Sequence, residues 1–174
     1  MKFVETPLAG AFVVELEPIT DDRGFFGRAW CREEFEANGL VSQIEQMNLS
    51  NNLTKGTFRG LHWQDPPHEE IKFFRCVKGA TFNTIVDMRP DSATYTKWFG
   101  VELSVDNHKA LYVPGQFANG YMALTDNAEA LYTVSRPYTP GVERGLRVDD
   151  PALGIELPIE ITSMSDKDKA WELL

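Results

Sequence analysis

The sequence predicts an all-β protein, an antiparallel sandwich or barrel with a few short helices. Short runs rich in Val, Phe, Ile, Tyr and Trp alternate with turn signals such as "DDRG", "RPDS", "VPG" and "TPG". These signals recur roughly every ten residues, which is typical of sandwiches and barrels. The chain shows no internal repeat or linker, and its 174 residues are 43% hydrophobic, enough for one sizeable core. We therefore expect one domain over residues 1–174.

Five apolar runs are the clearest strand candidates. In chain order they are "GAFVVEL" at 10–16, "IKFFRCV" at 71–77, "TFNTIVDM" at 81–88, "WFGVELSV" at 98–105 and "EALYTVS" at 129–135. Only two segments have a helical pattern, "CREEFEAN" at 31–38, which Gly39 ends, and "SDKDKAWELL" at 165–174.

The run at 71–77 carries apolar side chains at both parities, so both faces of this strand are expected to be covered. A second sheet would cover one face, and a helix or another subunit the other. Lys72 shares its parity with Phe74 and Cys76. Its ammonium group therefore points toward a covered face.

Composition limits the partners of the chain. With 17 basic and 26 acidic residues the net charge is -9, which disfavours nucleic acid and anionic lipid. The N-terminal segment fits neither a signal peptide nor a membrane span. Cys31 and Cys76 lack the spacing of a CxxC motif or a disulfide scaffold, so we expect reduced thiols in a cytoplasmic protein.

Three residue types suggest a reaction class. Proton removal and return beside a carbonyl needs an imidazole base, an ammonium group near the developing oxyanion and a phenol donor. His62, Lys72 and Tyr132 are the candidates, and Asp166 or Asp168 would orient the imidazole. Each also has an ordinary structural interpretation. Lys72 could extend past the strand end or pair with Glu69 or Glu70, and His62 and Tyr132 could be core residues.

A metal site is the competing chemistry for a small β-barrel. Such proteins usually offer two closely spaced histidines and a glutamate, then another histidine after a "PxG" turn. Here Gln64 follows His62 where a second histidine would stand, and Asn119 follows the turn. Amides replace imidazole poorly on a transition metal, so we expect none.

Two arginines beside glycines, Arg23 and Arg59, suit a diphosphate, because one guanidinium group can donate two parallel hydrogen bonds to phosphate oxygens. Both could equally be ordinary surface charges.

Ordered blocks over nearly the whole chain resemble the dTDP-4-dehydrorhamnose 3,5-epimerase family, whose members are cupins without a metal. The blocks are "DDRGFF" at 21–26, "QMNLS" at 46–50, "GTFRGLHWQ" at 56–64, "IKFFRCVKGA" at 71–80, "VDMRPDSATYTKWFG" at 86–100, "LYVPGQFANGY" at 111–121, "LYTVSRPYTP" at 131–140, "DDP" at 149–151 and "SDKD" at 165–168.

The resemblance implies a cupin jelly-roll that forms a homodimer and epimerises a nucleotide-linked 4-keto-6-deoxy sugar without a cofactor. His62 would be the base, with Asp168 as its orienting partner. Lys72 would stabilise the enolate oxygen, and Tyr132 would return a proton from the opposite face of the sugar.

The same resemblance implies the substrate contacts. Arg23 and Arg59 would hold the diphosphate, Gln46 and Asn48 would approach the nucleoside, and Tyr138 would stack near the base.

Three positions depart from the family pattern. Asn119 replaces a histidine, Arg28 replaces an acid that helps read the nucleotide, and Glu70 replaces a frequent glutamine near Lys72. Asn119 and Arg28 are nevertheless expected to contact the substrate. They leave open which nucleotide is bound and whether C3, C5 or both are inverted. The alternatives are a single-site epimerase acting on a CDP- or GDP-linked or other variant sugar, and a non-catalytic sugar-binding cupin.

Overall fold

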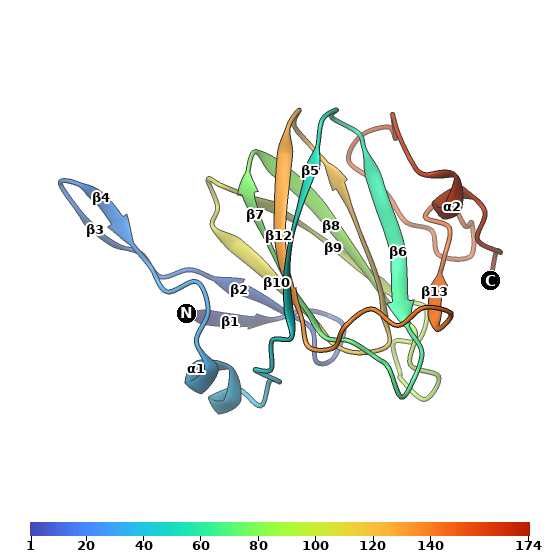
Figure 1. Ribbon diagram of the computed structural model, residues 1–174, viewed down its shortest axis with the longest axis horizontal. Helices are drawn as coiled ribbons and strands as arrows, with labels where there is room; N and C mark the ends of the chain where they lie inside the picture. Colours follow the sequence, from blue (N-terminus) through green and yellow to red (C-terminus); the bar gives the residue numbers. More distant parts are fainter.

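Two antiparallel sheets face each other in the computed structural model, which describes residues 1–174 (Figure 1). The six-stranded sheet has the order β1 (Lys2–Glu5), β2 (Phe12–Glu15), β10 (Lys109–Val113), β7 (Lys72–Lys78), β12 (Ala128–Val134) and β5 (Gln46–Asn52). The five-stranded sheet has the order β13 (Glu143–Gly145), β6 (Phe58–Gln64), β11 (Phe117–Ala123), β8 (Ala80–Asp87) and β9 (Trp98–Ser104). Most neighbouring strands are distant in sequence, which is the jelly-roll arrangement.

The remaining elements are small. A hairpin of β3 (Ile19–Asp21) and β4 (Gly24–Phe26) projects away from both sheets (Figure 1). The helices are α1 (Arg32–Ala37) and α2 (Asp166–Lys169). Neither has the length or apolar character that a bilayer-crossing helix requires.

Strand β7 confirms the sequence interpretation of two covered faces. Phe74 and Cys76 belong to the core between the sheets, and Lys72, of the same parity, lines the interior cavity described below. On the outer face, Phe73 meets Phe35 of α1 edge to face with ring centroids 5.1 Å apart. The second sheet therefore covers one face of β7 and a helix covers part of the other. Beyond the helix, Val77 is 39% exposed.

The helix expected at 31–38 is confirmed, but the one expected at 165–174 was too long. After Lys169 the chain leaves the helix so that Trp171 packs against Gly145 of β13. The backbone N–H of Leu174 then donates to Asp150, at 2.7 Å. These tertiary contacts outweigh the local helical preference of the last residues.

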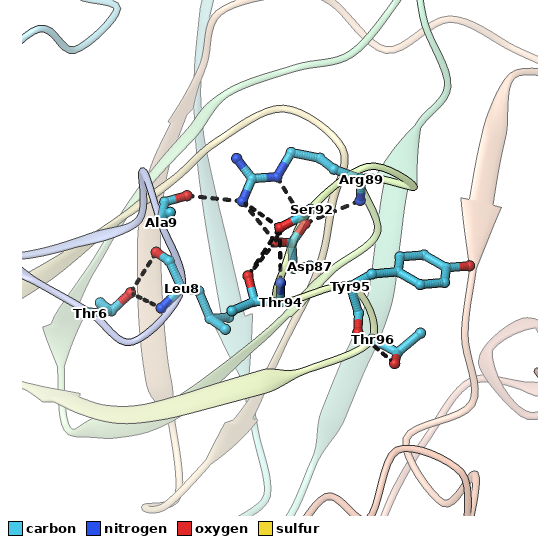
Figure 2. A network of polar contacts seen from close by, with 9 residues as sticks. All are labelled: Thr6, Leu8, Ala9, Asp87, Arg89, Ser92, Thr94, Tyr95 and Thr96. Atoms are coloured by element: carbon cyan, nitrogen blue, oxygen red, sulfur yellow. Dashed lines mark hydrogen bonds and ion pairs between the residues drawn. The ribbon is translucent and has the colours of Figure 1, made fainter.

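A buried acidic residue, Asp87, fixes the long loop after β8 (Figure 2). Its carboxylate accepts hydrogen bonds from the Arg89 guanidinium and from the hydroxyls of Ser92 and Thr94, at 2.6 to 2.8 Å. Arg89 also donates to the carbonyl of Ala9, 2.9 Å away. Burial alone would raise the pKa of Asp87, but these hydrogen bonds hold it well below its ordinary value.

Replacing Asp87 with Ala is expected to lower the free energy of unfolding by about 3–5 kcal/mol, because the Arg89 charge loses its partner. Urea denaturation would measure the change. Asp149→Ala removes an exposed partner of Arg147 and should cost less than about 1 kcal/mol. Because the pKa of Asp87 is depressed in the folded protein, the ionised carboxylate contributes its full stabilisation at a pH above the ordinary pKa of 3.8. This contribution to the free energy of unfolding disappears as the pH falls well below 3.8. Equal losses in the two variants would contradict this role.

Candidate functional site

A cavity of about 540 Å³ opens between the two sheets. His62, Lys72, Tyr132 and Asp168 all line it, although they come from β6, β7, β12 and α2. A smaller hollow of about 170 Å³ shares the first three of these residues. The fold thus brings together the four side chains expected to carry out the chemistry.

His62 and Asp168 form a close pair. Nε2 of His62 lies 2.6 Å from Oδ1 of Asp168. An ionised carboxylate only accepts hydrogen bonds, so Nε2 carries the hydrogen and Nδ1 is left as the basic nitrogen. Burial by itself would raise the pKa of Asp168, but hydrogen bonds from His62, the Gly60 N–H and the Ser165 side chain lower it. Asp166, the other candidate, is exposed and lies 3.7 Å from Lys169.

Gly60 allows the backbone to approach this pair. Its φ of 123° lies in a region that favours glycine, and a Cβ there would lie 2.5 Å from Cα of Gly120 on the neighbouring strand. The Gly60 N–H points at Oδ2 of Asp168, 3.4 Å away. Ser165 caps α2 by accepting from the Asp168 N–H at 3.1 Å, so these two contacts hold the Asp168 end of the pair in place.

Lys72 is both paired and exposed to the cavity. Its ammonium nitrogen lies 2.6 Å from Oε1 of Glu70 and 3.5 Å from the carbonyl of His62. The other Glu70 oxygen accepts from the buried amide of Gln64 at 2.8 Å. Lys72 is therefore both an ion-pair partner of Glu70 and a cation that faces the cavity.

Tyr132 enters the cavity from the sheet opposite His62. Its ring stacks on Phe74 with centroids 4.5 Å apart and an interplanar angle of 8°. Burial is the main cause that raises the pKa of Tyr132, and the charges of Tyr121 and Glu70 add to it. The phenol is therefore protonated at neutral pH and can donate a proton.

The larger cavity contains two further cations. Arg59 is held by Asn52, whose side-chain oxygen accepts from Nε at 2.8 Å, and Lys167 lies on α2. Asn119 is the register partner of His62 on β11 and lines the same cavity. Its side-chain oxygen is buried without a hydrogen-bond partner.

The residues expected to contact the nucleoside line the smaller hollow. Gln46 and Asn48, both on β5, and Tyr138 line it together with Glu70 and Glu143. This hollow is thus rich in hydrogen-bond acceptors, and its one cation, Lys72, is paired to Glu70.

Arg23 and Arg28 do not reach the cavity of their own chain. Arg23 lies on the projecting β3–β4 hairpin and pairs with Asp21 at 2.5 Å. Arg28 pairs with Glu34 of α1 at 2.9 Å. Within a single chain, these two substrate-binding predictions are therefore unsupported.

Several lining residues were not predicted from the sequence. They are Ser50, Tyr121, Glu143 and Lys167, of which Ser50 and Tyr121 share a hydrogen bond of 2.7 Å. Lys167 lies within the quoted block "SDKD", next to Asp168, and that position could have identified it. No group of three or more His, Cys, Asp or Glu side chains is arranged as metal ligands.

The fold and these side chains define a cupin barrel with proton-transfer groups in its cavity. Comparison with known proteins identifies it further: the family model described as dTDP-4-dehydrorhamnose 3,5-epimerase matches residues 5–174. The chain belongs to the dTDP-4-dehydrorhamnose 3,5-epimerase family, a family of isomerases.

Individual relatives cover nearly the whole chain. The Shigella flexneri dTDP-4-dehydrorhamnose 3,5-epimerase is 38% identical over 169 residues, 97% of this chain and 93% of its own length. The crystal structure of the Bacillus anthracis enzyme with TDP and PPi bound has a TM-score of 0.95 at 36% identity and covers 99% of each chain. The Legionella pneumophila enzyme in complex with dTDP-4-keto-L-rhamnose has a TM-score of 0.92 at 31% identity, over 99% of this chain and 92% of that one.

Proposed function

We propose that the protein epimerises a nucleotide-linked 4-keto-6-deoxy sugar at C3, C5 or both, most simply dTDP-4-keto-6-deoxyglucose. The observation that carries the proposal is the opposed pair in the cavity. His62, oriented by Asp168, projects from one sheet and the protonated Tyr132 from the other. Inversion at carbon needs a base and an acid on opposite faces of the sugar, and this pair supplies them.

In the proposed reaction, Nδ1 of His62 removes a proton from the carbon beside the ketone, and the negative charge moves to the ketone oxygen. Lys72 faces that oxygen. A cation about 4 Å from a developing oxyanion, at an effective dielectric constant of about 20, contributes about 4 kcal/mol. Glu70, paired to Lys72, offsets part of this. Tyr132 then returns a proton to the opposite face of the sugar ring. These steps use only side chains of the protein.

The substrate contacts are part of the same proposal. Arg59 and Lys167 supply positive charge for a diphosphate at the larger cavity. Gln46, Asn48 and Tyr138, which line the smaller hollow, would contact the nucleoside. Asn119, whose amide oxygen lacks a partner, would hydrogen-bond the sugar.

The choice of nucleotide is tested with a panel of dTDP-, CDP- and GDP-linked 4-keto-6-deoxyglucose, compared by kcat/KM. We expect the dTDP sugar to be preferred at least tenfold. A preference for CDP or GDP would support the second candidate, an epimerase for a variant nucleotide, which the change at Asn119 inside the cavity favours. Binding of all three sugars without conversion would instead indicate a sugar-binding protein.

Replacing Tyr132 with Phe is expected to separate proton removal from inversion. His62 can still exchange the substrate proton with deuterated water, but the acid on the opposite face is missing, so inversion should fall about 10²-fold or more. NMR of the recovered sugar would show deuterium at a carbon of unchanged configuration. Tyr112→Phe, which removes another buried hydroxyl outside the cavity, is the control. Unchanged inversion in Tyr132→Phe would exclude this tyrosine as the acid.

We also propose a homodimer, in which the β3–β4 hairpin packs on a second copy of the chain. Ile19 is 73% and Phe26 is 71% exposed on this hairpin, which lies away from both sheets (Figure 1). An isolated two-stranded hairpin is only marginally stable, and exposed apolar clusters mark interfaces. Met47 and Leu49 on the edge strand β5 are also exposed and offer a complementary apolar surface. Packing there would carry Arg23 toward a second copy.

If the protein is a dimer, sedimentation velocity should give a particle mass of twice the 19.7 kDa of one chain. Replacing Ile19 and Phe26 together with Ser should produce monomers and lower activity if Arg23 serves the neighbouring cavity. Leu173→Ser and Leu174→Ser, two changes at exposed apolar residues of the C-terminal segment, far from the hairpin (Figure 1), are the control. A native protein that sediments as a monomer with full turnover would contradict the proposal.

Two broader features belong to this proposal. The two cysteines are free thiols, Cys31 partly exposed and Cys76 buried, as a cytoplasmic location would allow. The chain would act as a single domain over residues 1–174.

A further inference from the structure

A second carboxylate flanks the His62 ring, and the reaction described above gives it no role. Oε1 of Glu143 lies 3.8 Å from Nδ1 of His62, on the side away from Asp168. Glu143 sits on β13, whose residue Gly145 is the register partner of His62. The imidazole therefore lies between a fixed partner at 2.6 Å and a looser one at 3.8 Å.

The two contacts differ in what they can do. The short Asp168 contact holds the Nε2 hydrogen in place, so a proton taken from the sugar must arrive at Nδ1. A separation of 3.8 Å is too long for a hydrogen bond. A small side-chain movement would bring the two atoms within hydrogen-bond distance, or one water could bridge them. Glu143 is thus the carboxylate nearest to the nitrogen that receives the proton.

The surroundings of Glu143 connect that nitrogen to solvent. Its side chain is 16% exposed and lines the smaller hollow together with His62. Its other oxygen pairs with the ammonium group of Lys167, whose side chain is 54% exposed. One end of the carboxylate therefore faces the half-buried ring, and the other end faces a cation at the surface.

The proposed reaction creates a need for such a connection. Each proton removal leaves His62 as an imidazolium, which cannot remove a second proton until the first has gone. Inverting two carbons of one bound sugar would require this reset while the substrate still fills the cavity.

We propose that Glu143 is the proton relay that resets His62. The N–H bond at Nδ1 breaks as an O–H bond forms on the Glu143 carboxylate, leaving neutral imidazole. The resulting carboxylic acid then passes its proton to water beside Lys167 and becomes a carboxylate again. This role rests on the proposed epimerase function, and Glu143 acts through His62.

The test uses the full-length protein, Glu143→Gln, and substrate tritiated at the carbon that loses its proton. Acid quenching releases any tritium held on His62. In Glu143→Gln we expect a rapid burst of up to one tritium per active site at close to the native rate. The steady rate that follows should be at least tenfold below native. Added imidazole or formate buffer should restore the steady rate in proportion to its concentration, because a small base replaces the relay.

Two results would overturn the relay. One is native burst and steady-state behaviour. The other is an equal loss in both phases without a response to buffer, which would mean that Glu143 positions His62 or contacts the sugar. Glu129→Gln removes a carboxylate from another lysine pair, with Lys78, outside the cavity and should behave as native. Absence of tritium release by the native protein would instead refute the proposed epimerase function itself.

Discussion

Replacing His62 with Ala is expected to lower kcat/KM by about 10²- to 10⁴-fold, the range that general acid–base catalysis contributes. The reason is geometric. Nδ1 of His62 is the basic nitrogen in the cavity, held in place by the Asp168 contact at 2.6 Å. Proton exchange at the sugar carbon should disappear together with turnover, because the variant lacks the proposed base that starts the reaction.

Two further variants make the result specific. His68→Gln changes another histidine, one outside the cavity that lies 3.4 Å from Thr139, and should retain turnover. Asp168→Asn keeps the shape of the partner but removes its charge, so a smaller loss is expected, accompanied by a changed pH profile. Turnover in His62→Ala within a factor of about three of native would mean that another group is the base.

Replacing Lys72 with Met should lower kcat by about 10²- to 10³-fold, with little change in KM. Removing one preorganised donor from a developing oxyanion typically costs about 2.7–4 kcal/mol. The neutral ketone of the bound substrate interacts less strongly with the ammonium group than the enolate does, so the loss falls on the chemical step. Steady-state kinetics, with kcat and KM determined separately, measures the effect.

Glu70 complicates this variant, because Lys72→Met leaves its carboxylate without a cationic partner at a position only 11% exposed. The double variant Lys72→Met, Glu70→Gln removes both charges and should remain as slow as the single one. Recovery of turnover in the double variant would show that the lysine only neutralises Glu70. Lys78→Met, at the exposed end of the same strand, is the matched control.

Much of the fold could be predicted from the sequence because its signals are local. The regular alternation of apolar runs and turn residues predicts a sandwich, and the shared parity of Lys72 and Phe74 places the lysine inside. The C-terminal segment was harder. Its helical pattern ends at Lys169 because Trp171 packs on β13, a contact that depends on residues distant in sequence.

The site shows the same division between local and tertiary signals. His62, Lys72, Tyr132 and Asp168 could be proposed from residue type and family motifs, and the fold brings them to one cavity. Glu143 could not, because only the pairing of β13 with β6 places it beside the imidazole.

The arginines of the N-terminal region show a different limit. Arg23 pairs with Asp21 on the β3–β4 hairpin, which projects away from both sheets (Figure 1). The motif around Arg23 does not show in which direction such a hairpin projects.

The most direct test of the account is proton exchange by the purified protein, without added metal or cofactor, acting on dTDP-4-keto-6-deoxyglucose in deuterated water. NMR would follow the H3 and H5 signals of the sugar. We expect loss of both signals with inversion at both carbons, or of one signal if the chain is a single-site epimerase. Retention of both signals, with the dTDP-linked and with the CDP- and GDP-linked sugars, would contradict the proposal that His62 and Tyr132 form an acid–base pair for epimerisation.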